Sequence, residues 1–197
     1  MSLREATKQA NRAAILDAAR DVFADLGYGA ASVRDIVRGT DLATGTFYNY
    51  FPDKEAVFRA LLEESASEVR ARARAARRAA GSFEEFVEHA YRAAFEFLAE
   101  DPQFFGLMQR NAGTIATQFP EPIHAMSVAE LEEDLRAGVL TGVVPDHDCA
   151  YMAAAMVGTA FEVGVRMVER EPPDVHGATM FATELFLGGM MRMRRAT

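Results

Sequence analysis

Five hydrogen-bonding side chains gather on one short segment near the amino-terminal end of the chain. Thr44, Thr46, Tyr48, Asn49 and Tyr50 occupy one face of a helix that we expect to run from about residue 44 to residue 50. Hydroxyl and amide groups match the donors and acceptors of base edges, and an asparagine can pair with adenine through two hydrogen bonds. The residue types therefore indicate a helix that contacts bases and phosphates from the major groove of duplex DNA.

A second short helix comes just before this segment and is expected to position it. Apolar residues at 33, 36 and 37 follow helical spacing, and the pattern breaks at Gly39 and Thr40. A break of this length that contains a glycine is typical of two helices that cross steeply. Phe47 and Phe51 lie four residues apart, so we expect both to face inward while the polar residues face outward.

The stretch from Ser32 to Lys54 resembles the helix-turn-helix of the TetR family of transcription regulators. The resemblance is carried by Gly27-Tyr28, Ser32-Val33, Ile36-Val37, Gly45-Thr46-Phe47-Tyr48, Tyr50-Phe51 and Lys54-Glu55. It implies a DNA-binding head followed by an all-helical regulatory domain. It also implies a homodimer that binds a palindromic double-stranded DNA operator, most often as a repressor, and that is released by a small-molecule effector.

We expect Thr44, Thr46 and Asn49 to contact bases. We expect phosphate contacts from Ser32, Tyr48, Tyr50 and Lys54, a role that the resemblance implies for Ser32 and Lys54. The full set of predicted DNA-binding residues is Ser32, Arg34, Thr44, Gly45, Thr46, Tyr48, Asn49, Tyr50 and Lys54. Tyr50 stands where histidine is frequent in the family. Residues 1–8 are predicted to be a loose arm that could touch DNA through Arg4 or Lys8, but we favour a frayed terminus.

The composition indicates a folded, all-helical protein. Half of the 197 residues are hydrophobic and a quarter are charged, so we expect a packed core. The net charge is −8, but residues 1–80 hold 13 Lys and Arg against 11 Asp and Glu, while the remainder holds 8 against 18. The acidic excess therefore lies outside the predicted DNA-binding part, where phosphate binding depends on the placement of individual cations.

One cysteine, Cys149, excludes an intrachain disulfide and is typical of a reducing compartment. Residues 1–12 are polar and do not form a signal peptide. The longest apolar stretch, residues 149–165, contains Glu162 and is short for a bilayer. We expect a cytoplasmic protein with no membrane segment.

We predict about nine helices in two domains, a helix-turn-helix domain at residues 1–53 and a regulatory, ligand-binding and dimerisation domain at residues 54–197. Residues 112–122 are expected to be a loop with one short turn. Arginines crowd the last turns of the helix that starts near residue 53, and we interpret them as a solvated face. The predicted helices are 9–26, 33–37, 44–50, 53–80, 83–100, 102–108, 122–137, 146–170 and 174–195.

The last two helices are apolar on more than one face, which one small core cannot bury completely. Intrachain packing is one explanation, and we favour a dimer interface made of two copies of each helix. The residues predicted for that interface are Ala153, Val157, Ala160, Gly164, Phe181, Leu185, Phe186 and Gly189.

Aromatic and methionine side chains are frequent in the middle of the chain, where they can form a core or line an adaptable apolar cavity. If a cavity exists, it should bind an apolar or amphipathic small molecule, with Arg92, Gln109, Arg110, Asn111 or His124 as polar contacts. The residues predicted to line it are Tyr91, Phe95, Phe104, Met108, Met126, Met152 and Met156.

No residue pattern indicates a metal site, a cofactor or an enzyme. His147 lies between two aspartates, but no two histidines share ligand spacing and Cys149 has no cysteine partner. Glu162 and Arg166 are spaced as an ion pair on one helix. No phosphate-binding glycine loop or nucleophile motif is present. The alternative that stays open is a helical small-molecule-binding protein or enzyme whose helix-turn-helix is only structural.

Overall fold

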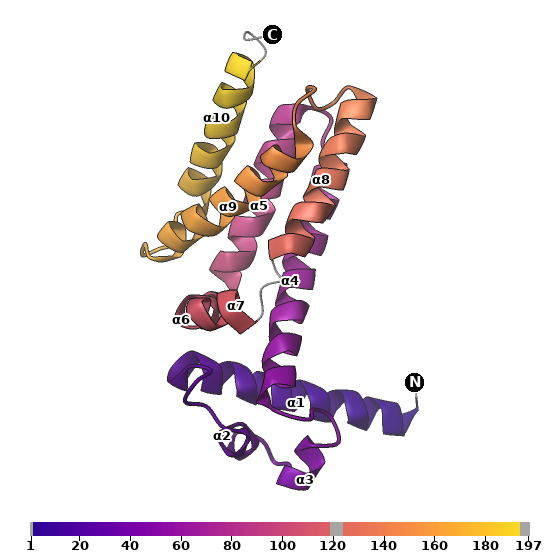
Figure 1. The fold of residues 1–197 in the computed structure, drawn as a ribbon, viewed down its shortest axis with the longest axis vertical. Coiled ribbons are helices and arrows are strands. Elements are labelled where there is room, and N and C mark those ends of the chain that lie inside the picture. Colours follow the sequence, from indigo (N-terminus) through magenta and orange to yellow (C-terminus); the bar gives the residue numbers. More distant parts are fainter. Residues whose placement is uncertain (1, 119–123, 194–197) are drawn as a thin grey trace. The chain divides into compact units, whose positions relative to one another are not determined.

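The computed structural model describes residues 2–118 and 124–193, and the regular elements in these residues are ten helices (Figure 1). The predicted all-α class is confirmed. The helices are α1 (Leu3–Leu26), α2 (Val33–Arg38), α3 (Thr44–Phe47), α4 (Lys54–Arg78), α5 (Phe83–Glu100), α6 (Pro102–Arg110), α7 (Ala112–Gln118), α8 (His124–Thr141), α9 (Cys149–Val168) and α10 (Val175–Met193).

The chain forms two compact units. The head unit comprises Met1–Ser65 with Gln103–Pro120, and the body unit comprises Ala66–Pro102 with Glu121–Thr197. Helix α4 contributes to both, since the division falls between Ser65 and Ala66. The domain boundary predicted before residue 54 coincides with the start of α4, whereas the packing units divide inside that helix.

Helix α1 begins at Leu3, so the prediction of a loose arm over residues 3–8 is wrong. A capping box fixes its start: the Ser2 hydroxyl accepts from the Glu5 N–H at 3.3 Å, and the Glu5 carboxylate accepts from the Ser2 N–H at 2.7 Å. These hydrogen bonds also hold the pKa of Glu5 below its usual range. The serine and the glutamate are three residues apart, which is the local sequence signal of a helix start.

Helix α7 lies where the sequence predicts a loop. Its residues Gly113, Thr114 and Thr117 are weak helix formers, so local propensity gives no helical signal. The Ile115 N–H donates to the Asn111 carbonyl at 2.8 Å and continues the hydrogen bonding of the preceding helix. Helix α9 begins at Cys149 rather than at residue 146, because the Asp148 carboxylate accepts from the N–H groups of Ala150 and Tyr151, each at 3.0 Å.

Aromatic rings from separate helices form the core of the head unit. Phe23 of α1 and Phe58 of α4 pack edge to face with ring centroids 5.0 Å apart, and both are fully buried. Ile36 of α2 is also fully buried. A Cβ added to Gly39 would meet the Cβ of Ala18 at 2.9 Å, so the turn between α2 and α3 lies directly on α1 and requires glycine there.

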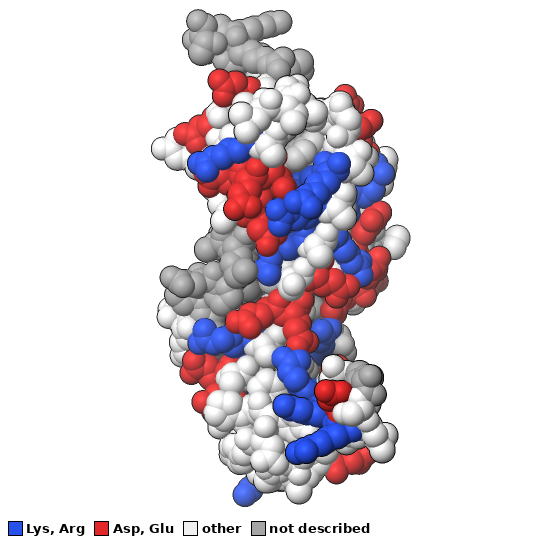
Figure 2. Space-filling view, turned by 90° about the vertical axis from the view of Figure 1, so that its right-hand side faces the viewer, with Lys and Arg blue, Asp and Glu red and all other residues white. Residues whose placement is uncertain are grey.

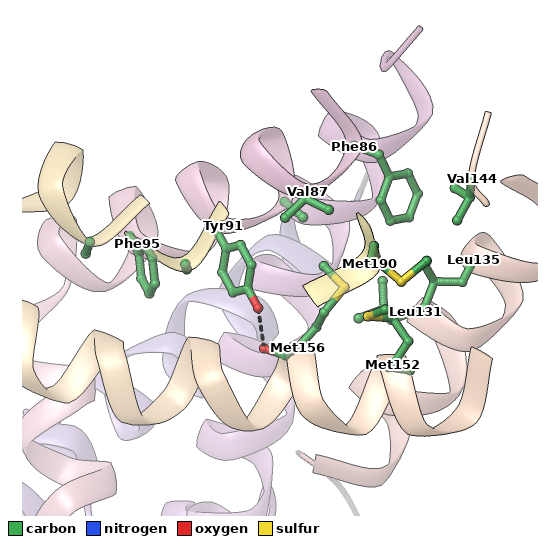
Figure 3. Close-up of a cluster of buried hydrophobic side chains, with 14 of the residues drawn as sticks. Phe86, Val87, Tyr91, Phe95, Leu131, Leu135, Val144, Met152, Met156 and Met190 are labelled. Atoms are coloured by element: carbon green, nitrogen blue, oxygen red, sulfur yellow. Dashed lines mark hydrogen bonds between the residues drawn. The ribbon is translucent and has the colours of Figure 1, made fainter. Parts of the chain in front are cut away.

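The core of the body unit lies among α5, α8, α9 and α10, and α5 packs against both α9 and α10. Figure 3 shows the Tyr91 hydroxyl donating to the Met156 carbonyl, at 3.2 Å, within a cluster of phenylalanine, leucine and methionine side chains. Burial raises the pKa of Tyr91 far above its usual value. The labelled members of the cluster are Phe86, Val87, Tyr91, Phe95, Leu131, Leu135, Val144, Met152, Met156 and Met190.

The arginines near the end of α4 are not simply a solvated face. Arg77 is 8% exposed and donates two hydrogen bonds to one oxygen of Asp134 on α8, at 2.6 and 3.0 Å. Burial lowers the pKa of Arg77, while the hydrogen bonds to Asp134 act in the opposite direction. Figure 2 shows basic and acidic side chains interleaved over the body unit. Further ion pairs join Arg70 to Glu130, Arg72 to Glu68 and Glu100, and Arg74 to Glu133 and Asp134.

Candidate nucleic-acid interface

Helix α3 turns its apolar side chain inward and its polar side chains outward. Phe47 is fully buried and Phe51 is 6% exposed, which confirms the predicted inward pair. Thr46 is half-buried, and Tyr48 is 54% exposed. The exposed residues of this segment are Thr44, Gly45, Tyr48 and Asn49. The head unit therefore presents hydroxyl and amide groups to solvent on a short helix that a buried phenylalanine fixes in place.

The segment after α3 is a turn rather than helix, since α3 ends at Phe47 and not at Tyr50. The Tyr50 N–H donates to the Phe47 carbonyl at 2.9 Å. The Tyr50 hydroxyl accepts a hydrogen bond from the Asn11 side-chain amide of α1 at 3.1 Å. Tyr50 is thus half-buried against α1, while its hydroxyl proton stays available to a phosphate oxygen.

Ser32 caps α2, as the sequence predicts. Its hydroxyl accepts from the Asp35 N–H at 3.3 Å, and the Asp35 carboxylate accepts from the Ser32 N–H at 3.0 Å. The hydroxyl and amide of Ser32 hold the pKa of Asp35 below its usual range. Ser32 and Arg34 are both exposed, so both remain accessible to a ligand.

Lys54 is engaged by the loop between α1 and α2. Its ammonium group donates to the carbonyls of Tyr28 at 2.7 Å and Ala31 at 2.8 Å. It also lies 4.6 Å from the centre of the Tyr28 ring. The lysine therefore holds this loop to the start of α4, a role that sequence reasoning missed because its partners are backbone carbonyls more than 20 residues away.

Asn111 holds the same loop from the other side. Its side-chain oxygen accepts from the Tyr28 N–H at 2.7 Å, and its amide nitrogen donates to the carbonyls of Leu107 at 2.8 Å and Phe23 at 3.4 Å. Arg110 donates to the Asp25 carbonyl. Asn111 is 3% exposed, so the expectation that it contacts a small molecule gives way to a structural role in the head unit.

The candidate cavity residues fall in both compact units. Tyr91, Phe95, Met152 and Met156 belong to the core of the body unit, whereas Phe104 and Met108 are buried in the head unit. The side chains of Met126 and His124 lie outside the described part of the chain. Arg92 is exposed and pairs with Glu88 on its own helix. Within the described part of the body unit, Tyr91, Phe95, Met152 and Met156 belong to one buried cluster.

The residues predicted for the dimer interface separate into exposed and buried groups. Phe181 is 59% exposed and Leu185 is 53% exposed. Ala153 and Gly164 are buried inside their own chain, and a Cβ on Gly164 would meet Leu98 at 2.6 Å. These two residues therefore pack the body core and do not contribute to an exposed face. The other four, Val157, Ala160, Phe186 and Gly189, are half-buried.

Three further apolar side chains of α9 and α10 are exposed, and the sequence interpretation omitted them. Tyr151 is 79% exposed, Phe161 40% and Met180 38%. Tyr151 and Phe161 belong to α9, which also carries the buried Met152 and Met156, so α9 has both buried and exposed apolar side chains. Among the described helices, α9 alone is long and apolar enough to span a membrane. This is weak evidence, because core helices of other proteins pass the same test; 28% of the apolar window of α9 is buried.

The predicted pair of Glu162 with Arg166 is replaced by a pair of Arg166 with Glu169, whose atoms are 2.9 Å apart. Both Glu162 and Arg166 line a surface cleft of about 530 Å³ between α9 and α10.

His147 forms a hydrogen bond through Nδ1 with the Pro145 carbonyl oxygen, at 2.5 Å. Within the described residues, no three His, Cys, Asp or Glu side chains are grouped closely enough to hold a metal ion.

The amino-terminal part of this chain is similar to known regulatory proteins. Residues 15–61 match the family model described as bacterial regulatory proteins, tetR family. The A-factor receptor protein of Streptomyces griseus is 40% identical over 55 residues, which are 28% of this chain and 20% of the receptor. The transcriptional repressor Rv1474c of Mycobacterium tuberculosis is 42% identical over 55 residues, 28% of this chain and 29% of the repressor. The matched segment thus spans less than a third of either relative.

Solved structures resemble the chain over most of its length. The fatty acid degradation regulator FadR of Bacillus halodurans has a TM-score of 0.77 and 27% identity, over 90% of this chain and 95% of its own. A TetR-family regulator of Pectobacterium atrosepticum has a TM-score of 0.70 and 25% identity, over 96% and 97%. FadR of Bacillus subtilis, solved with stearoyl-CoA, has a TM-score of 0.76 and 22% identity over 87% and 95%, a likeness of fold alone.

Proposed function

We propose that this chain, which belongs to the TetR family of bacterial regulatory proteins, is a ligand-responsive transcriptional regulator that binds a palindromic operator as a homodimeric repressor. The observation that carries the proposal is the outward polar face of α3. Thr44, Tyr48 and Asn49 are exposed there, and the buried Phe47 fixes the orientation of the helix. A rigid display of hydrogen-bonding groups is what direct readout in a major groove needs.

The exposed residues divide into base-reading and phosphate-binding roles. Thr44, Thr46 and Asn49 would contact base edges, and Asn49 has the amide that pairs bidentately with adenine. Tyr48 and Arg34 are exposed and would hold phosphates. Ser32 and Tyr50 would add hydroxyl contacts from side chains that the head unit already orients.

The dimer would use the exposed apolar side chains of α9 and α10. Large apolar groups with exposures of 38–79% on two adjacent helices are costly in water and are covered when a second copy binds the same face. A two-fold arrangement would place two copies of α3 at about 34–36 Å, one turn of DNA, or at a multiple of it. This separation suits a palindromic operator.

A small apolar or amphipathic effector would release the repressor. The body core is rich in methionine and aromatic side chains, which repack around ligands of varied shape. The similarity to FadR of Bacillus halodurans, a fatty acid degradation regulator, supports long-chain acyl compounds as the first class to examine. Binding in the body unit would act on the head unit through α4, which continues from Lys54 to Arg78.

Operator binding by matched variants tests the proposal. A duplex is first selected from a random pool, and its affinity is then measured by fluorescence anisotropy at fixed salt. Asn49→Ala should cost about 1–3 kcal/mol for each half of the selected duplex and less on a random one. Gln109→Ala, an exposed amide of the head unit on α6, is the control and should bind normally. The proposal fails if no duplex binds at low ionic strength, or if both variants bind like the unsubstituted protein.

A further inference from the structure

A surface groove of about 650 Å³ lies between the first two turns of α1 and the turn that follows α3. Its walls are Leu3, Arg4, Thr7, Lys8, Asn49 and Tyr50. The four residues of α1 lie on one face of that helix, because they occur in pairs four residues apart. The wall formed by α1 is therefore basic, and the opposite wall includes Asn49, whose amide is proposed to contact a base.

The basic wall is held in place by contacts of α1 with the end of the helix-turn-helix. The Asn11 amide donates to the Tyr50 hydroxyl at 3.1 Å. The Arg12 guanidinium lies 5.5 Å from the centre of the Phe51 ring and pairs with Glu64. At ~1.5 Å rise per residue, the helix continues ~10 Å beyond Asn11 to Arg4. Because the capping box keeps these turns helical, Arg4 has a defined place beside the groove.

The charges around the groove favour an anion. Arg4 and Lys8 are exposed, and neither is in an ion pair with any other residue that the structure describes. Glu5 is the acidic residue of this stretch, and its carboxylate is occupied by the Ser2 N–H. Figure 2 faces the amino-terminal end of α1, where basic side chains gather at the lower end of the view.

We propose that Arg4 and Lys8 form a second DNA-contact surface, which binds backbone phosphates of the duplex next to the groove that α3 reads. The inference rests on the proposed function. The occupant is duplex DNA because the groove shares Asn49 with the base-reading face, so a duplex on α3 carries its phosphates toward α1. Lys8 and Arg4 are ~6 Å apart along the helix, and each cation binds a phosphate oxygen without reading the base.

Salt dependence measures this surface directly. Each phosphate that a cation neutralises adds about 0.9 to the slope of log affinity against log salt concentration, because a counterion is released. Two contacts in each head, and so four in the proposed homodimer, should therefore contribute about 3.6 to the slope. The contribution should be the same for the operator and for an unrelated duplex, since phosphate contacts carry no sequence information.

The experiment compares two variants of equal net charge by anisotropy on the selected duplex between 50 and 200 mM salt. Arg4→Gln with Lys8→Gln removes four cations from the dimer, so it should lower the slope by about 3.6 and reduce the change in affinity over that range by about 150-fold. Arg78→Gln with Arg136→Gln, two exposed arginines of the body unit, is the control and should keep the full slope. Both variants should melt at the temperature of the unsubstituted protein, because these side chains are exposed.

Two outcomes would overturn the inference while leaving the proposed function intact. An unchanged slope for the Arg4 and Lys8 variant would show that these residues do not reach phosphates. Equal changes in the two variants would show that only net charge matters. If the unsubstituted protein binds no duplex at any salt concentration, the proposed function fails, and the inference fails with it.

Discussion

Two groups of basic residues in this molecule have opposite surroundings. Arg70, Arg72, Arg74 and Arg77 on α4 are paired with carboxylates of α4, α5 and α8, and Arg77 is nearly buried. Arg4 and Lys8 on α1 face an open groove, and no ion pair holds them among the described residues. The α4 group has more arginines, yet each of them is already paired with a carboxylate of the protein. The lack of an ion pair beside the proposed base-reading face therefore distinguishes Arg4 and Lys8 from these four arginines, and the number of cations does not.

The largest expected effect within this comparison is the loss of the Arg77 guanidinium. Arg77→Ala leaves the Asp134 carboxylate, whose side chain is 10% exposed, without its closest cation. Removal of one member of a buried pair costs about 3–5 kcal/mol, so the urea midpoint should fall sharply. Replacement of both residues by leucine should restore most of the loss, because no buried charge remains. If Arg77→Ala unfolds at the normal urea concentration, the pair is hydrated and the contrast with α1 is false.

Lys54 has hydrogen-bond partners within the protein and is also a predicted phosphate contact. We expect its replacement to have an intermediate effect on stability. Lys54→Met keeps the aliphatic stem but removes the charged hydrogen bonds to the Tyr28 and Ala31 carbonyls, so it should destabilise the protein by about 1–3 kcal/mol in urea unfolding. If Lys54 also binds a phosphate in each head of the dimer, the salt slope of operator binding should fall by about 1.8. A stability loss with an unchanged slope would leave Lys54 only its role in the loop.

Sequence periodicity predicted the local part of the fold. Phe47, Phe51 and Ile36 repeat at helical spacing, and each is buried as that spacing requires. Ser32 caps α2 through a residue only three positions away. These features depend on neighbours within one turn, so they are readable before any tertiary structure is known.

The features that the sequence did not reveal depend on distant partners. Asn111 binds the backbone of Phe23 and Tyr28, and Arg77 pairs with a carboxylate 57 residues away. No local pattern specifies such contacts. The prediction that Ala153 and Gly164 lie in a dimer interface is wrong, because α9 is apolar on both sides and periodicity alone does not decide which side meets its own core.

The smallest expected effect belongs to Arg72, which pairs with Glu68 and Glu100 at 2.6 Å each but keeps 41% of its side chain exposed. Water already solvates these charges, so Arg72→Ala should change the melting temperature by about 2 °C or less, and high salt should abolish the difference. The salt dependence of operator binding should stay unchanged, because Arg72 is paired with protein carboxylates and does not displace counterions from a DNA phosphate. Calorimetry at two salt concentrations checks the first expectation and anisotropy the second. A reduced slope would show that a paired arginine of α4 reaches DNA, and pairing would then no longer distinguish the two basic groups.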